Sequence, residues 1–409
     1  MLDWLFLRSL AALLVSAVLL APLAALADDE TPATLTIGFL TQATNRVAPE
    51  PYLDPPPADE GLAGARLGVN DDNTTGRFVN QHFALGAVTV PEGGDIRDGF
   101  RQLVAKGIRL VVADLPEPAL LAVADLPEAK DVTIFNAGAP DDDLRNAKCR
   151  ANVLHTLPSR DMLADALVQY LLTKQWSHIF LVIGPSEADH AYAASIRRAI
   201  AKFHATLVEA KPWTFQPGSR RSDTGHYAES AEVAHFTQGI SYHFFWTYDV
   251  LVIADEEDAF GDYFDYATDE PRPIAGTHGL RAAGWARPHQ EWGATQLQDR
   301  FLHLAKRWMT DRDYAAWLAV RAAGEAATRT QSVDPAAIAA YMRSDKFELG
   351  GYKGLPLSFR PWDGQMRQAI LLYDSRALVS VSPQRGFLHQ TSELDTLGDD
   401  RPESQCHLH

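Results

Sequence analysis

Acidic side chains follow four apolar runs of this sequence, at the point where each run ends. They are Asp114 with Glu117, Asp141, Asp189, and Asp255 with Glu256. Several carboxylates that converge on one cleft repel one another, so such a cleft favours a cation. The cation could be an ammonium or guanidinium group of a ligand, or a hard metal ion with oxygen ligands. The alternative is that these residues cap helices, because Asp and Glu are common at helix N-termini.

Signatures of catalysis are missing from the sequence. It has no G-x-S-x-G, H-E-x-x-H or Walker motif, and no G-x-G-x-x-G in a strand-to-helix turn. The residues that could form an acid/base set, as in an exported hydrolase, are Asp189, Asp255 and His278. We therefore expect a protein that is not an enzyme and that has no cofactor other than a bound metal ion.

Hydrophobic periodicity predicts the elements that position these residues. Short apolar runs bounded by Gly, Pro or acidic residues predict buried strands at residues 35–40, 110–113, 132–135, 179–183 and 250–254. Apolar residues at helical spacing predict helices around residues 96–104, 192–203, 297–308 and 314–321. This alternation predicts doubly wound α/β layers with parallel strands, in which ligands bind beyond the carboxyl ends of the strands. The pattern restarts after residues 152–158, which we interpret as a crossing between two α/β lobes.

The first 27 residues are typical of a cleavable secretory signal peptide. An apolar run from Leu10 to Leu26 follows Arg8 and ends in small residues before an acidic stretch. A membrane anchor is the competing interpretation, but Pro22 and the acidic stretch favour cleavage. We expect residues 1–27 to be removed and the mature protein to be periplasmic, without insertion in a membrane.

The net charge argues against one class of partner, and the cysteine content allows one disulfide. The formal net charge is −16, which argues against nucleic acid because a phosphate-binding surface needs clustered Lys and Arg. The two cysteines, Cys149 and Cys406, can close one intramolecular disulfide in an oxidising compartment, or stay free thiols. The tail from Cys406 to His409 has a metal-binding composition, although chain ends usually fray.

Several segments resemble the branched-chain amino-acid-type periplasmic binding proteins of ABC transporters. Residues 61–78 (GLAGARLGVNDDNTTGRF) resemble the helix and turn after the first strand of that family, and residues 314–374 resemble its C-terminal part. Residues 71–78 and 149–156 resemble a subgroup associated with pyrroloquinoline-quinone-dependent alcohol dehydrogenase systems. The resemblance implies the α/β type I periplasmic binding fold, two Rossmann-like lobes joined by a hinge of crossing strands. It also implies a permease and an ATPase as partners, and closure of the lobes on a small ligand.

The resemblance further implies where the lobes and the ligand site lie. Lobe 1 would comprise residues 28–150 and 279–355, lobe 2 residues 151–278 and 356–388, with residues 389–409 as a tail. The implied ligand-binding residues lie in strand-end loops: Asp114, Glu117, Asn136, Ala137, Gly138, Asp141, Asp189, Asp255, Glu256 and His278.

These loops depart from the pattern of an amino-acid site. A ligand carboxylate beside Asp114 and Glu117 would be repelled by ~1 to 4 kcal/mol per close charge pair. We therefore expect a cationic or metal-containing ligand. The alternative from another class is a ligand-sensing or scaffold protein of the same fold that acts with a membrane sensor.

Overall fold

The structure is a computed structural model that describes residues 31–43, 57–213, 233–237, 248–265 and 267–408. The expected signal peptide, residues 1–27, lies outside the described residues. Ala33–His409 is one compact unit of chain, and everything below concerns that unit. Within the described residues, no helix has both the length and the apolar character needed to cross a membrane.

The first half of the unit is built on a five-stranded sheet in which every pair of neighbours is parallel. Its order is β2-β1-β3-β4-β5. The strands are β1 (Ala33–Gln42), β2 (Gln81–Val90), β3 (Leu110–Asp114), β4 (Thr133–Asn136) and β5 (Val153–His155). The predicted runs at 35–40, 110–113 and 132–135 are confirmed as β1, β3 and β4, and as parallel strands.

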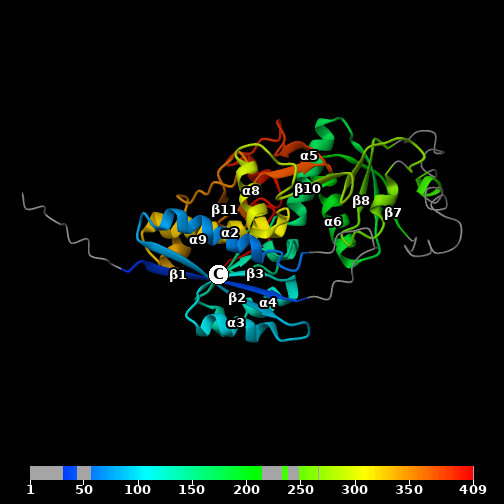
Figure 1. Ribbon diagram of the computed structural model, residues 1–409. Coiled ribbons are helices and arrows are strands. Elements are labelled where there is room, and N and C mark those ends of the chain that lie inside the picture. The colour runs from blue at the N-terminus through cyan, green and yellow to red at the C-terminus, as the bar shows by residue number, and fades with distance from the viewer. Residues whose placement is uncertain (1–30, 44–56, 214–232, 238–247, 266, 409) are drawn as a thin grey trace, which may run out of the picture. The chain divides into compact units, whose positions relative to one another are not determined.

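Helices cover both faces of this sheet, which explains why its central strands β3 and β4 are buried on both sides. Alternate side chains of β3, such as Val112 and Val111, enter two different cores. The core of Val112 also contains residues of α2 (Leu62–Gly76), α8 (Ala294–Ala305), α9 (Asp311–Thr330) and α10 (Pro335–Met342). The core of Val111 contains residues of α3 (Ile96–Ala105) and α4 (Glu117–Ala124). Figure 1 shows α2 lying beside α9, its main helical neighbour.

The second half is built on a seven-stranded sheet of order β14-β13-β10-β9-β8-β6-β7. Its strands are β6 (His178–Ile183), β7 (Thr206–Pro212), β8 (Val250–Ala254), β9 (Ile274–Gly276), β10 (Leu280–Ala283), β13 (Ile370–Tyr373) and β14 (Leu378–Ser382). The strands from β6 to β10 pair in parallel, whereas β13 and β14 are antiparallel. Helices α5 (Arg160–Thr173) and α6 (Glu187–Lys202) pack on one face of this sheet.

An aromatic core covers β6 and β8 on the other face of the second sheet. Phe180 of β6 and Leu251 of β8 enter it with Trp213, Phe260 and Phe264. Tyr248, which precedes β8, is 1% exposed and belongs to the same core.

The chain passes between the two sheets three times, from β5 to α5, from β10 to α8, and from β12 (Met366–Arg367) to β13. Two of these crossings are hydrogen bonded to each other. Gln368 Nε2, which follows β12, donates to the carbonyl oxygen of Thr156, which follows β5, at 2.8 Å. Lys353 Nζ donates to Gln368 Oε1 at 2.7 Å. Its pKa is lowered to about 7 because the ammonium group is buried. These contacts connect the crossings with the first half of the unit.

Sheet pairing differs from the expected lobe boundaries by a few residues. β5 pairs with β4 in the first sheet, although the boundary after residue 150 assigned it to lobe 2. β10 pairs with β9 in the second sheet, although the segment 279–355 was assigned to lobe 1. Phe359 and Met366 pack in the first core, although both follow residue 356. The hydrogen-bonded neighbour of a strand decides to which sheet the strand belongs. The order of apolar runs in the sequence does not identify that neighbour.

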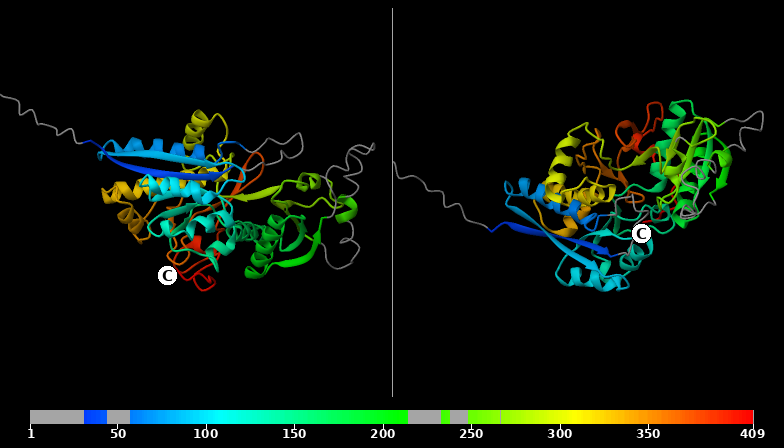
Figure 2. Two further views of the ribbon diagram at one scale, coloured as in Figure 1. Left: turned by 90° about the horizontal axis from the view of Figure 1, so that it is seen from below. Right: turned by 45° about the vertical axis from the view of Figure 1, so that its right-hand side comes forward.

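The C-terminal tail contacts both halves of the unit. The structure contains the expected disulfide between Cys149 and Cys406, whose Cα atoms are 5.7 Å apart. Asp399 accepts hydrogen bonds from Asn146, which precedes β5, and from Arg198 of α6. Figure 2 shows the red C-terminal segment against this part of the chain. The tail therefore connects a loop of the first sheet with a helix of the second.

Candidate functional site

The acidic residues at the strand ends of the first sheet are paired with basic side chains. Asp114 ends β3 and is 8% exposed, and Arg312 Nη1 donates to its Oδ1 at 3.3 Å. Glu117 begins α4, and Lys148 Nζ donates to its Oε1 at 2.6 Å. A cationic ligand would therefore have to compete with these two basic side chains.

The loop after β4 is closed by its own hydrogen bonds. Asn136 Oδ1 accepts from the backbone N–H groups of Gly138 at 3.2 Å and Ala139 at 2.9 Å. Ala137 is fully buried in the first core, and a Cβ at Gly138 would lie 2.5 Å from the backbone nitrogen of Leu115. Asn136, Ala137 and Gly138 therefore stabilise the loop itself. The backbone N–H groups of Gly138 and Ala139 already donate to Asn136.

Arg160 joins the strand ends of the two sheets. Its Nη1 donates to Asp141 Oδ1 at 2.9 Å, and Asp141 follows β4. Its Nε and Nη2 donate to the two carboxylate oxygens of Glu256, both at 2.8 Å, and Glu256 follows β8. The side chain of Arg160 is only 8% exposed, against 29% for Asp141 and 24% for Glu256. Two of the predicted ligand-binding residues, Asp141 and Glu256, are thus brought together by a guanidinium that was not among the predicted site residues.

Asp189 and Asp255 are held mainly by backbone amide groups. Asp189 forms a capping box with Ser186 at the start of α6, and its Oδ1 accepts from the backbone N–H of Glu256 at 2.7 Å. The capping interpretation is therefore confirmed for Asp189. Asp255 accepts from the N–H groups of three residues at 2.7 to 3.0 Å, which are Ala259, Phe260 and Gly261.

The strand ends of the second sheet keep an excess of negative charge. One guanidinium, that of Arg160, serves both Asp141 and Glu256. Burial raises the pKa of the Glu256 carboxyl group, and Asp141 and Asp189 raise it further, while Arg160 opposes them. A raised pKa means that the site disfavours additional negative charge, so a neutral or cationic ligand group fits better than a carboxylate.

His278 lies with carboxylates of the β8–β9 connection rather than with Asp189. Its Nε2 is 2.8 Å from Asp258 Oδ1 and 3.9 Å from Asp255 Oδ2. On its other side, Nδ1 is 3.0 Å from Thr277 Oγ1. That hydroxyl donates to the carbonyl oxygen of Ile253 at 3.1 Å. Of the acid/base set considered for a hydrolase, Asp255 and His278 lie close together, whereas Asp189 forms a capping box with Ser186.

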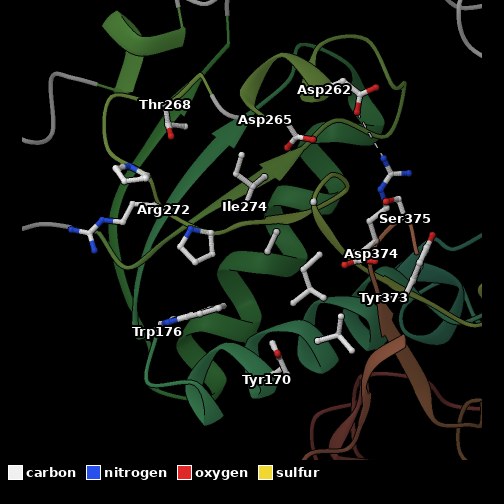
Figure 3. A pocket seen from close by; sticks show the side chains of 17 residues that line it. Tyr170, Trp176, Asp262, Asp265, Thr268, Arg272, Ile274, Tyr373, Asp374 and Ser375 are labelled. Atoms are coloured by element: carbon white, nitrogen blue, oxygen red, sulfur yellow. Dashed lines mark ion pairs between the residues drawn. The ribbon is translucent and has the colours of Figure 1, made fainter. Parts of the chain in front are cut away.

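A cavity of about 1000 Å³ lies on the second sheet, over β9 and β10, and none of the predicted site residues lines it (Figure 3). Between β8 and β9 the described residues contain only the short 3-10 helix η4 (Gly261–Phe264). A parallel crossover usually carries a helix that covers the sheet, so this connection leaves part of the face open. Apolar side chains such as Ile274 and Leu280 line the cavity together with Arg272, Arg281 and Asp265.

Part of the sequence matches a known family. Residues 95–234 match the family model described as periplasmic binding protein. A branched chain amino acid ABC transporter periplasmic ligand-binding protein from Burkholderia xenovorans has the same fold. The TM-score is 0.70 at 15% identity, over 91% of this chain and 99% of that chain. The chain has the fold of a periplasmic binding protein.

Two other solved binding proteins agree with this fold. The leucine-, isoleucine-, valine-, threonine- and alanine-binding protein from Brucella ovis gives a TM-score of 0.65 at 13% identity, covering 92% of this chain and 99% of that chain. An ABC transporter substrate-binding protein from Desulfitobacterium hafniense in complex with leucine gives 0.62 at 16% identity, covering 84% and 99%. No curated protein matches the sequence. The expected α/β fold is confirmed, and the matched family is one of binding proteins, in agreement with a chain that is not an enzyme.

Proposed function

We propose that this protein is the substrate-binding component of an ABC transporter and takes a small ligand at the strand ends of its two sheets. The observation that supports the proposal is the Arg160 bridge between Asp141 of the first half and Glu256 of the second. In open α/β sheets, ligands bind beyond the carboxyl ends of the strands. A ligand that replaced part of this bridge would connect the same two loops and favour the closed arrangement.

The proposed ligand carries a cationic group. It does not bind to the loop after β4 through a carboxylate. The relative from Desulfitobacterium hafniense is in complex with leucine, which has a carboxylate. In this chain the amide groups of Gly138 and Ala139 already donate to Asn136. Asp141 and Glu256 share one guanidinium, so an ammonium group beside them would be stabilised.

A thermal-shift screen of the mature, metal-stripped protein tests this ligand class. The panel contains amines, amino acids, alcohols, aldehydes, quinone cofactors, calcium and a lanthanide. A ligand at 100 times its Kd should add about 2.7 kcal/mol to the unfolding free energy. We expect amines to stabilise the protein, with Glu256→Gln weakening the binding at least about tenfold, equal to about 1.4 kcal/mol.

The matched control is Glu257→Gln, which removes the same charge from the neighbouring, exposed position. It should leave the binding unchanged. Stabilisation by leucine but not by amines would overturn the ligand class while supporting the transport role. No stabilisation by any compound would favour the alternative, a sensor or scaffold that acts with a membrane protein.

The link to alcohol oxidation is a second part of the proposal. It is supported by the resemblance of residues 71–78 and 149–156 to the subgroup associated with pyrroloquinoline-quinone-dependent alcohol dehydrogenases. A strain without this protein should grow more slowly on alcohols as the sole carbon source, and as fast as the parent on sugars. Equal growth on both would contradict the link.

Export to the periplasm is also proposed, because residues 1–27 have the layout of a signal peptide. N-terminal sequencing of protein from the periplasmic fraction should begin at Asp28. Intact Met1 in a membrane fraction would instead show that the segment is an anchor.

A further inference from the structure

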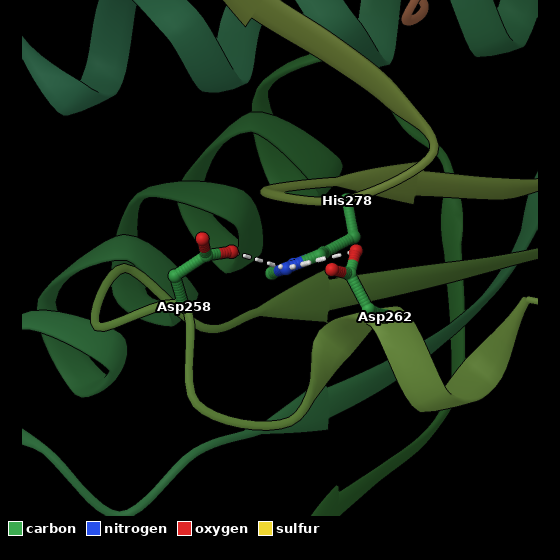
Figure 4. Close-up of side chains that lie close together, drawn as sticks. All are labelled: Asp258, Asp262 and His278. Atoms are coloured by element: carbon green, nitrogen blue, oxygen red, sulfur yellow. Dashed lines mark hydrogen bonds and ion pairs between the residues drawn. The ribbon is translucent and has the colours of Figure 1, made fainter. Parts of the chain in front are cut away.

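Three side chains from two neighbouring strand ends converge beside the second sheet: Asp258, Asp262 and His278 (Figure 4). One oxygen or nitrogen atom of each lies within 4.8 Å of those of the other two. His278 Nε2 is 2.8 Å from Asp258 Oδ1 and 3.7 Å from Asp262 Oδ1. The imidazole is buried, whereas the carboxylates are 44% and 60% exposed, so a dissolved ion can reach the cluster from solvent.

The orientation of the imidazole is fixed from two sides. His278 Nδ1 is 3.0 Å from Thr277 Oγ1. The ring also packs on Gly261, where a Cβ atom would lie 2.1 Å from His278 Nδ1. These contacts direct Nε2 toward the two carboxylates. Histidine ligands of metals are typically oriented in this way, by a partner on the nitrogen that does not bind the metal.

The loop that carries both carboxylates is also held in place. Asp255 accepts hydrogen bonds from the backbone N–H groups of residues 259, 260 and 261, which lie between Asp258 and Asp262. Asp258 itself has φ of 56°, a left-handed conformation that Asp tolerates better than most residues. In this loop conformation the two carboxylates lie on either side of the imidazole, as Figure 4 shows.

The cluster contains more negative than positive charge. Asp255 Oδ2 adds a third carboxylate at 3.9 Å from His278 Nε2. The guanidinium of Arg281 lies beside Asp262, with its Nη2 4.0 Å from Asp262 Oδ1. Three carboxylates around one imidazole favour an added cation.

We propose that Asp258, Asp262 and His278 bind a divalent cation of the zinc type, with water at the remaining position. One imidazole and two carboxylates suit Zn²⁺, whereas Ca²⁺ and Mg²⁺ prefer oxygen ligands throughout. The inference does not depend on the proposed function, because it needs no ligand at the Arg160 bridge.

Isothermal titration of the metal-stripped mature protein with ZnCl2 tests the proposal. We expect one Zn²⁺ per chain and no comparable binding of Ca²⁺. Both cysteines are in the disulfide, so a titration with Co²⁺ should give the visible absorption of a nitrogen and oxygen site without a thiolate band. The variant Asp258→Asn/Asp262→Asn should weaken Zn²⁺ binding more than about 100-fold, since loss of supporting residues alone costs 10- to 100-fold.

Two further variants make the titration specific. Glu257→Gln removes one charge from the same loop outside the cluster and should leave the Zn²⁺ affinity unchanged. Arg281→Gln removes the basic side chain beside Asp262 and should tighten Zn²⁺ binding. Both aspartates are substantially exposed, so the double variant should fold, and circular dichroism checks this.

Zinc that remains bound in the double variant would overturn the proposal and direct attention to the histidines of the tail. Equal affinity for Ca²⁺ and Zn²⁺ would overturn the zinc type. Failure to bind Zn²⁺ together with stabilisation by amines would remove this inference and leave the proposed function intact. Binding of Zn²⁺ without stabilisation by amines would support this inference and count against the proposed ligand class.

Discussion

A single side chain, that of Arg160, neutralises part of the charge of the acidic residues at the strand ends. Asp141 and Glu256 are separated by more than a hundred positions in the sequence, and each looks like an unpartnered carboxylate at a strand end. Arg160 contacts both, with two hydrogen bonds to Glu256 and one to Asp141. A buried guanidinium that is shared in this way costs desolvation, which is recovered only while both carboxylates stay in place.

The substitution Arg160→Met tests the contribution of this bridge to stability. It leaves Asp141 and Glu256 close together without a countercharge, so we expect the unfolding free energy at pH 7 to fall by about 3 kcal/mol. Urea denaturation measures the change. The control is Arg97→Met, which removes an exposed ion pair with Asp95 and should cost less than about 1 kcal/mol. Equal effects of the two substitutions would contradict a structural role for the bridge.

At the scale of elements, the contact between α2 and α9 depends on small residues. A Cβ atom at Gly64 would lie 1.8 Å from the carbonyl oxygen of Asp313. One at Gly68 would lie 2.8 Å from Cβ of Val320. The two helices approach so closely that there is no room for a side chain at these positions, which are four residues apart and therefore on one face of α2.

Gly64→Ala should therefore destabilise the protein, although alanine favours helix formation by about 1 kcal/mol over glycine. The atom that it would meet belongs to the backbone of α9 and cannot turn away, so we expect a net loss of about 1 to 3 kcal/mol. Gly350→Ala is the matched control, because a Cβ there meets nothing within 4 Å and no positive φ is involved. Urea denaturation of both variants compares them, and a neutral Gly64→Ala would show that the helices can separate at no cost.

The same helix pair contains a buried carboxyl group that makes stability depend on pH. Burial raises the pKa of Asp72 from 3.8 to about 7, although Arg321 of α9 opposes the shift. The folded state therefore binds this proton more tightly than the unfolded state. The stability that results is fully present below pH 3.8 and is lost as the pH rises to about 7.

Asp72→Asn removes this titration. The unfolding free energy of the variant relative to the original protein should increase from pH 4 to pH 7, by at most about 1.4 kcal/mol per pH unit, and stay constant above pH 7. Denaturation curves recorded at several pH values measure this difference. A difference that does not change between pH 4 and pH 7 would mean that Asp72 is ionised throughout.

At the scale of elements, fully buried strands are easier to predict from the sequence than partly exposed ones. Strands β3 and β8 were predicted because all their residues are buried, which gives continuous apolar runs. β2 was not predicted because only three of its side chains are buried and its middle contains Ala84 and Gly86. Arg160 was missed because its role needs the spatial approach of two loops. Its place directly after the N-cap Ser159, at the end of the first crossing, was the only local sign.

In the molecule as a whole, the C-terminal tail closes a long loop of chain. The disulfide joins Cys149 to Cys406 across 257 positions. Next to it, Gln405 donates its backbone N–H to Asn146 Oδ1 at 2.9 Å, and Lys202 of α6 donates to the carbonyl oxygen of Gly398 at 2.7 Å. The covalent bond thus fixes a tail that also binds a helix of the second half, and its loss would free both contacts.

Cys149→Ser/Cys406→Ser should lower the unfolding free energy by about 4 kcal/mol, because closing so long a loop removes much entropy from the unfolded chain. Urea denaturation measures this loss, and hydrogen exchange should show faster exchange of the amides in the last turn of α6, which contains Lys202. Dithiothreitol should destabilise the original protein by the same amount and leave the double variant unchanged. If the variant kept its stability but α6 exchanged faster, the disulfide would serve to hold the tail between the two halves rather than to stabilise the fold.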